Sequence, residues 1–430
     1  MCIASKNKIV VKKILVLLAL PIIYSSSMNA QNYEESKIPQ YSVPKLLLSE
    51  VGQKITSADT WEEGRRNEVL GLFNDQMYGK VPEFEYTKDY QHRILKNDAL
   101  NGKATQEEVT ITIANEKGEI KITMLLTLPN TTQGPVPIFL GLNFYGNQAT
   151  SHNKEVTLTD NYVLNNKDLG IADHHAGENS RGGRLSNWPF EMILAKGYGL
   201  ATFHCGDIDP DFDDGFNNGV HALIDTPPEA NEWGTIAAWA WGLSRAMDYL
   251  ETDERIDNHR VAVIGHSRLG KTSLWAGAID ERFALVISNN SGCGGAALSR
   301  RRIGETVEVI NSSFPHWFCK NFHQYNGKED DLPLDQHMLI ALIAPRPVYV
   351  ASAQEDQWAD PKGEYTSLFL AGPVYKLYGF QTMQTEQPPP VDSPLFRGKL
   401  GYHIRTGAHA LTEYDWEQYL KFADKCLDRD

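Results

Sequence analysis

Apolar and polar residues alternate along the chain with two different periods, which predict strands and helices in turn. Residues 108–114 and 120–128 alternate at every second position around Lys117-Gly118, and this pattern predicts a β-hairpin. Short apolar stretches then predict strands at residues 136–144, 198–205, 261–264, 285–288, 348–353 and 400–406. Helical periodicity is found at residues 232–250, 269–279, 363–378 and 411–427.

Strand and helix follow one another through most of the chain, which predicts an α/β fold. We expect a mainly parallel central sheet with helices on both faces and a leading antiparallel hairpin, an arrangement that resembles the α/β-hydrolase fold. A helix over residues 59–78 should precede the hairpin and begin at a capping box of Asp59 and Glu62. Residues 146–190 have no clear period, and so long a loop in a compact domain is usually either functional or disordered.

The first thirty residues have the pattern of a secretory signal peptide. Lysines precede an apolar run at residues 14–24, and small residues lead to Ala30. The run of eleven residues is too short for a membrane helix, which needs roughly 20. We therefore expect a signal peptide over residues 1–30, a single catalytic domain over residues 31–430, no membrane span in the mature chain, and a secreted or periplasmic location.

Composition and charge exclude several classes of partner. The chain is 41% hydrophobic and 22% charged, which is typical of a globular protein. Its formal net charge is −14, and loss of the four lysines in residues 1–30, which contain no acid, brings it to −18. Nucleic-acid binding needs clustered basic residues, so nucleic acid is not expected as a partner. We expect a monomer that uses neither a metal nor another cofactor.

An aspartate-rich loop follows the strand at residues 198–205. It lacks the glycine and the glutamate that a calcium-binding loop requires at fixed positions. A solvated loop, or a turn paired with an arginine, is the preferred interpretation of its carboxylates, Asp207, Asp209, Asp211, Asp213 and Asp214.

Two chemistries are compatible with the segment Gly265-His-Ser-Arg-Leu-Gly-Lys-Thr, which joins a predicted strand to a predicted helix. In the first, a sharp turn exposes Ser267 as a nucleophile, and the backbone amide of Arg268 faces the developing oxyanion. The common Gly-x-Ser-x-Gly pattern is broken here, because Leu269 holds the last position and glycine comes one residue later.

In the second, Gly265 and the run Gly270-Lys271-Thr272 match the spacing of a phosphate-binding P-loop. The predicted signal peptide and the late position of the motif argue against a nucleotide-binding protein. The strand at residues 285–288 is also followed by asparagines, where a magnesium-binding acid is expected.

The nucleophile interpretation predicts more than the serine, because an acid and then a histidine should each follow a later strand. Glu355 and Asp356 come directly after the strand at residues 348–353, and His409 comes directly after the strand at residues 400–406. The chain therefore carries candidates for a Ser, acid and His triad in the expected order.

The segment from Gly265 to Lys271 resembles the signature of the glucuronoyl esterases, carbohydrate esterase family fifteen, in its bacterial form. Residues 290–295, 311–318, 344–347 and 356–361 are also similar to that family. The resemblance extends from about Trp61 to the C-terminal helix, so it covers most of the mature chain.

The resemblance implies a role for each matching residue. It makes Ser267 the nucleophile and His409 the base, and it gives Arg268 an oxyanion role with its side chain as well as its amide. The family places its acid after one of two strands. Because the earlier position is Asn290 here, Asp356 remains, with Glu355 as its neighbour. Sugar binding is implied for three further residues, Lys271, Glu305 and Trp358, although many relatives carry glutamine at position 305.

The implied substrate is an ester that joins a glucuronate or 4-O-methyl-glucuronate side chain of xylan to an alcohol of lignin. An esterase of the same fold that acts on another plant-polysaccharide ester, such as an acetyl xylan esterase, is the main alternative. Lys271 and Arg268 favour the first, because an acetyl group offers no sugar for them to hold. A non-enzymatic glycan-binding relative is a third alternative, and the complete triad argues against it.

Overall fold

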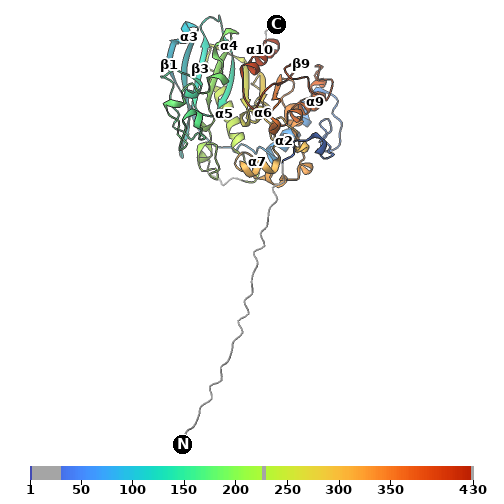
Figure 1. The fold of residues 1–430 in the computed structure, drawn as a ribbon. Coiled ribbons are helices and arrows are strands. Elements are labelled where there is room, and N and C mark those ends of the chain that lie inside the picture. Colours follow the sequence, from blue (N-terminus) through green and yellow to red (C-terminus); the bar gives the residue numbers. More distant parts are fainter. Residues whose placement is uncertain (2–30, 225–228, 428–430) are drawn as a thin grey trace. The chain divides into compact units, whose positions relative to one another are not determined.

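The strands of the described residues form a single ten-stranded sheet (Figure 1). The computed structural model describes Met1, residues 31–224 and residues 229–427, so the predicted signal peptide lies outside the described residues apart from Met1. The strands are β1 (Thr87–Asp98), β2 (Ala104–Asn115), β3 (Gly118–Pro129), β4 (Val136–Asn143), β5 (Gly199–His204), β6 (Ile256–His266), β7 (Leu285–Asn289), β8 (Val348–Ala353), β9 (Leu395–Arg397) and β10 (Leu400–Arg405). Their spatial order is β1-β2-β3-β5-β4-β6-β7-β8-β10-β9.

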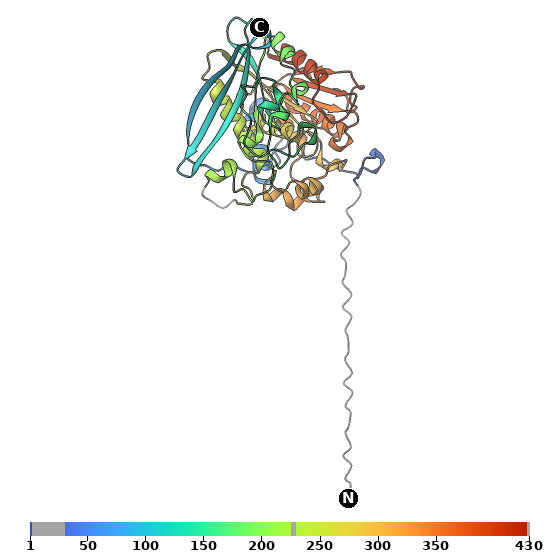
Figure 2. The ribbon, with the colours of Figure 1, turned by 60° about the vertical axis from the view of Figure 1, so that its left-hand side comes forward.

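The sheet is parallel in its centre and antiparallel at both ends. Each neighbouring pair from β5 to β10 in this order is parallel, and β9 adds to β10 in the antiparallel sense. The predicted hairpin is confirmed as β2 and β3, which pair from Asn115 opposite Gly118. Strand β1, which the sequence pattern did not predict, extends the hairpin outward, and the three long strands lie along one edge in Figure 2.

Helices precede, connect and follow the strands. They are α1 (Ala58–Thr60), α2 (Arg66–Gln76), α3 (Ala99–Gly102), α4 (Phe190–Ala195), α5 (Thr235–Leu250), α6 (Arg268–Ile279), α7 (Val307–Ser313), α8 (Gln336–Ala341), α9 (Pro361–Leu377) and α10 (Glu413–Leu427). Among the described residues, no helix combines the length and the apolar character needed to cross a membrane.

The predicted first helix is present as α1, a π-helical turn at Trp61–Arg65, and α2, but the predicted cap was wrong. The capping box is formed by Ser57 and Thr60: the amide of Thr60 donates to the hydroxyl of Ser57 at 3.3 Å, and the amide of Ser57 donates to the hydroxyl of Thr60 at 3.2 Å. Ser57 has the extended backbone that a cap requires, so the helix begins before Asp59 can act as one.

Alternate residues of the central strands pack into two separate cores, one on each face of the sheet. In β6, Val261 and Val263 join the core formed with α2, α5, α6, α8 and α9, whereas Ala262 and Ile264 join the core formed with α4 and α10. A strand covered on both sides must be apolar at every position, which explains its continuous apolar pattern. The carboxyl ends of these parallel strands meet at one edge of the sheet, and the segments that follow β6, β8 and β10 meet there.

Candidate active site

Ser267 lies in a sharp turn between β6 and α6. Its backbone has φ 58° and ψ −129°, an unfavourable conformation for a residue with a side chain, and its amide donates to the carbonyl of Asn289 at 2.9 Å. Gly265 makes the turn possible, because a Cβ atom there would lie 1.8 Å from the carbonyl oxygen of Leu269. Leu269 itself is 2% exposed and packs into the core. The turn therefore forms although the Gly-x-Ser-x-Gly pattern is broken, because the side chain of Leu269 packs into the core.

The P-loop interpretation does not fit this turn. The amides of Gly270 and Lys271 donate to the carbonyl of Ser267 at 2.8 and 3.2 Å, whereas a P-loop directs such amides at a phosphate. The side chain of Lys271 is 5% exposed and is paired with an acid of this chain, Glu305.

His409 and Asp356 meet beside Ser267, at the carboxyl edge of the sheet. His409 Nδ1 and Asp356 Oδ2 are 2.6 Å apart, although the two residues are 53 positions apart in the sequence. Asn290, at the earlier of the two acid positions, donates to the same oxygen at 2.9 Å. The histidine therefore pairs with Asp356, while the neighbouring Glu355 is exposed and its amide donates to the carbonyl of Gly407.

The charge of Asp356 is set by opposing effects. Burial raises the pKa of this carboxyl, but the hydrogen bond and charge of His409 and the hydrogen bond from Asn290 outweigh burial and hold the pKa below its usual value. An ionised Asp356 can accept a hydrogen bond from Nδ1–H of His409, which would leave Nε2 free to act as a base toward Ser267.

A cavity of about 320 Å³ beside Ser267 brings together the predicted catalytic, oxyanion and sugar-binding residues. We call it the smaller cavity. The predicted site residues in its lining are Ser267, Arg268, Lys271, Glu305, Asp356, Trp358 and His409.

Arg268 is held rigidly at the mouth of the turn. Its Nε lies 2.9 Å from Asp211 Oδ2, and its guanidinium lies between the rings of Phe144 and Trp317, at 4.9 and 5.4 Å from their centroids. Asp211 also binds the ring nitrogens of His316 and Trp317, at 3.0 and 2.7 Å. Burial raises the pKa of Asp211, but Arg268 and these two hydrogen bonds hold it below its usual value. The interpretation of the aspartate-rich loop as paired with an arginine is confirmed for Asp211.

Lys271 and Glu305 form a buried pair in the lining of the smaller cavity. Lys271 Nζ donates to the carbonyl of Ser291 at 2.6 Å and lies 3.5 Å from Glu305 Oε2, and the two side chains are 5% and 6% exposed. Burial raises the pKa of Glu305 above its usual value even though Lys271 opposes the shift. The amide of Glu305 donates to the carbonyl of Trp358, whose side chain is partly exposed at the rim.

Comparison with known proteins decides the family. The family model described as "Glucuronyl esterase, fungi" matches residues 189–379. Carbohydrate esterase MZ0003, from an unknown prokaryotic organism, is 52% identical over 397 residues, which cover 91% of each chain. The chain belongs to carbohydrate esterase family 15.

Two solved structures of family 15 have the same fold as more than nine-tenths of this chain. A promiscuous esterase of family 15 from a marine bacterial metagenome is 51% identical, with a TM-score of 0.86 over 92% of this chain and 100% of that one. A glucuronoyl esterase from Solibacter usitatus is 44% identical, with a TM-score of 0.85 over 91% of this chain and 100% of that one. The predicted resemblance and the α/β-hydrolase fold are both confirmed.

A second cavity, of about 490 Å³, opens on the other side of Ser267 in this family 15 esterase. We call it the larger cavity. It shares Ser267, Arg268 and His409 with the smaller one, and the long loop at residues 146–190 supplies Arg184 and Trp188 to its lining. Part of this long loop thus lies beside Ser267.

Sequence reasoning missed His266, which occupies the variable position before the nucleophile. Its Nδ1 lies 2.6 Å from Asn289 Oδ1, and its ring centroid is 4.5 Å from that of His409. Burial, followed by the charge of His409, lowers the pKa of His266 to about 3, so this ring is neutral wherever the enzyme is folded at ordinary pH. Among the described residues, no group of three or more His, Cys, Asp or Glu side chains is arranged to hold a metal.

Proposed function

We propose that the chain is a serine esterase that cleaves esters of glucuronate or 4-O-methyl-glucuronate with lignin alcohols, on side chains of xylan. The observation that carries the proposal is the buried pair of Lys271 and Glu305 in the same cavity as Ser267. A charged donor and acceptor held out of water suit the hydroxyls of a sugar ring, and an acetyl group has none. The smaller cavity lies near the lower end of the roughly 300–1,000 Å³ of small-molecule sites, which suits one sugar ring.

The reaction follows from the order of the groups around Ser267. The serine Oγ attacks the ester carbonyl carbon while His409 Nε2 takes the hydroxyl proton, and a tetrahedral oxyanion forms. When it collapses, the bond to the alcohol oxygen breaks, and the proton on His409 passes to that oxygen. Asp356 stabilises the imidazolium between these steps. Water then attacks the carbonyl carbon of the acyl-enzyme while His409 takes a proton from it. When this second intermediate collapses, His409 gives the proton to the Oγ of Ser267, which releases the uronic acid and free Ser267.

Arg268 supplies the oxyanion donors in this proposal. Its amide is at the N-terminus of α6, where a helix favours negative charge. Its guanidinium is already fixed by Asp211 and two aromatic rings, so it reorganises little as charge develops. A single preorganised donor of this kind is worth about 2.7–4 kcal/mol in the transition state.

The two cavities divide the substrate between them. The uronate ring takes the smaller cavity, beside Lys271, Glu305 and Trp358, and the alcohol leaves through the larger cavity, whose walls include Phe144, Tyr145 and Trp188. We also propose that residues 31–430 act as one catalytic domain and as a monomer, after export directed by residues 1–30.

The test compares two esters with one enzyme. Purified protein should hydrolyse methyl or benzyl glucuronate with a much higher kcat/KM than 4-nitrophenyl acetate, and Ser267→Ala should abolish both activities. Higher activity on acetylated xylan than on glucuronate esters would favour the acetyl esterase instead. The full sequence should be expressed in a secreting host. N-terminal sequencing of the secreted protein tests the cleavage after residue 30, and its sedimentation tests whether it is a monomer.

A further inference from the structure

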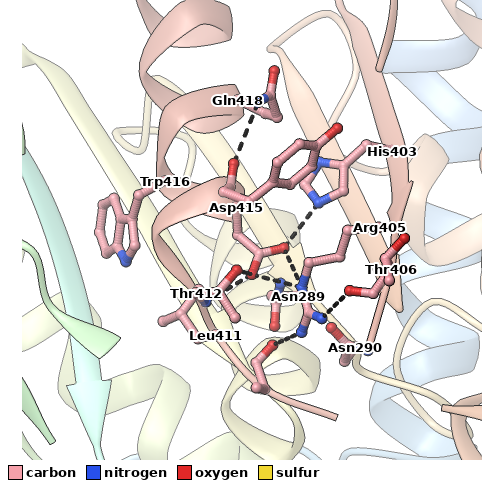
Figure 3. Close-up of polar contacts among 12 residues, drawn as sticks. Asn289, Asn290, His403, Arg405, Thr406, Leu411, Thr412, Asp415, Trp416 and Gln418 are labelled. Atoms are coloured by element: carbon pink, nitrogen blue, oxygen red, sulfur yellow. Dashed lines mark hydrogen bonds and ion pairs between the residues drawn. The ribbon is translucent and has the colours of Figure 1, made fainter. Parts of the chain in front are cut away.

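A buried ionic cluster joins α10 to the end of β10, the strand that precedes the loop with His409 (Figure 3). Its centre is Asp415, in the first turn of α10, whose side chain is fully buried. The carboxylate binds His403 Nε2 at 2.8 Å and Arg405 Nε at 3.0 Å, and it accepts from both the amide and the hydroxyl of Thr412 at 2.7 Å. Each carboxylate oxygen of Asp415 therefore accepts a hydrogen bond. Arg405 is held both by its place in β10 and by its ion pair with α10.

Both Nη atoms of Arg405 donate into the loop that carries His409. Nη1 donates to the carbonyl of Thr406 at 3.0 Å. Nη2 donates to the carbonyls of Ala408 and Ala410 at 2.9 and 2.7 Å. These two residues flank His409, so one guanidinium nitrogen bridges the backbone on both sides of the triad histidine.

The loop has few other fixed points close to His409. In the described part of the chain, the amide of Glu355 donates to the carbonyl of Gly407, and Asn187 donates to the carbonyl of Leu411. Both bonds lie two residues away from the histidine. The imidazole itself is 39% exposed, so packing alone does not set its place, and its bond to Asp356 sets the ring orientation more than the backbone position.

We propose that Arg405, held in place by Asp415, is a positioning residue that fixes the backbone of His409 relative to Ser267. The inference rests on the proposed function, because it assigns His409 the role of base. Arg405 lines neither the smaller nor the larger cavity, so it acts on the reaction through His409 and not through substrate. A misplacement of about 1 Å can cost about 100-fold in rate, which sets the scale of the expected effect.

The test variant is Arg405→Lys, which keeps the charge beside Asp415 but loses the fork that bridges the two carbonyls. We expect kcat to fall about 10- to 100-fold on both methyl glucuronate and 4-nitrophenyl acetate, with KM unchanged within about twofold. The matched control is Arg346→Lys. Arg346 also donates to three backbone carbonyls, those of Gly277, Asp280 and Phe283, but it lines neither active-site cavity. The control should lower Tm without a change in kcat.

A second measurement separates positioning from a general structural defect. In a His409→Ala background there is no side chain left to position, so Arg405→Lys should change neither the residual kcat nor the activity restored by added imidazole. An equal fractional loss in both backgrounds, or an equal loss in Arg346→Lys, would overturn the proposal. Full kcat in Arg405→Lys would overturn it as well.

Three provisions keep the test decisive. If Arg405→Lys does not fold, Asp415→Asn replaces it, and a kcat loss that disappears in the His409→Ala background is again expected. If wild-type enzyme cleaves the acetate but no glucuronate ester, the proposed substrate is wrong, and the acetate still tests the positioning role. If the Ser267→Ala variant of the enzyme keeps its activity, the triad itself is wrong and the positioning proposal falls with it.

Discussion

Replacing Lys271 by methionine should convert the enzyme from a uronate esterase toward a simple esterase. The change keeps the length and the apolar stem of the side chain but removes its ammonium group from Ser291 and Glu305. A buried charged hydrogen bond is worth about 1.5–3 kcal/mol, which corresponds to about 10- to 150-fold in kcat/KM for a substrate that uses it. Methyl glucuronate should lose this factor, and 4-nitrophenyl acetate should change less than about threefold.

The same variant has a pH signature in its stability. Burial already raises the pKa of Glu305, so the folded chain binds this proton more tightly than the unfolded chain does, and stability falls as pH rises from the unfolded pKa through the folded one. Without Lys271 the folded pKa rises further, so the loss of urea stability should grow as the pH rises above 4.5, the usual pKa of this carboxyl. Adding Glu305→Gln should remove this pH dependence, because it removes the buried carboxyl, but it should not restore activity on glucuronate esters.

The assay is kcat/KM on both esters for wild type and variants, with Lys88→Met as control. Lys88 also pairs with a carboxylate, that of Asp248 at 2.6 Å, but its side chain is 34% exposed and it lines neither cavity. Equal losses on the two esters in Lys271→Met would refute the reasoning and would mean that Lys271 supports the turn at Ser267. If the stability loss of Lys271→Met did not depend on pH, the conclusion that burial raises the pKa of Glu305 would be refuted.

Further predictions concern the triad. Ser267→Ala should remove activity, while Ser267→Gly should be inactive but have a higher Tm than Ser267→Ala, because glycine relieves backbone strain of about 1–3 kcal/mol at φ 58°. Asp356→Asn should lower kcat by about 10²- to 10⁴-fold, and Glu355→Gln should not, as steady-state rates on methyl glucuronate will show. The stability difference between wild type and Asp356→Asn in urea should be constant at pH 5–7 and shrink below about pH 4, because the lowered pKa of Asp356 stabilises the fold above its unfolded pKa and that benefit is lost on protonation.

Periodicity in the sequence predicts those strands and helices whose side chains pack into the hydrophobic core. The strands from β4 to β8 were predicted because helices cover both faces and every position must be apolar. Strand β1 was missed for the opposite reason, since it is an edge strand whose residues Thr87–Asp98 are mostly exposed and polar. The short helices α4, α7 and α8 were missed as well, because six or seven residues make too few turns to show a period.

Order along the chain was enough to place Ser267, Asp356 and His409 at one edge, because each follows a parallel strand and the carboxyl ends of such strands meet. The groups that hold these residues in place follow no such rule. Asp211 fixes Arg268 from a loop, and Asp415 fixes Arg405 from the first turn of a helix. Which carboxylate reaches which arginine depends on the conformation of segments without a period. The approximate positions of the proposed catalytic residues thus follow from the sheet and can be predicted from the sequence. The contacts that fix the exact positions of their side chains and backbone depend on loops, and only the structure shows them.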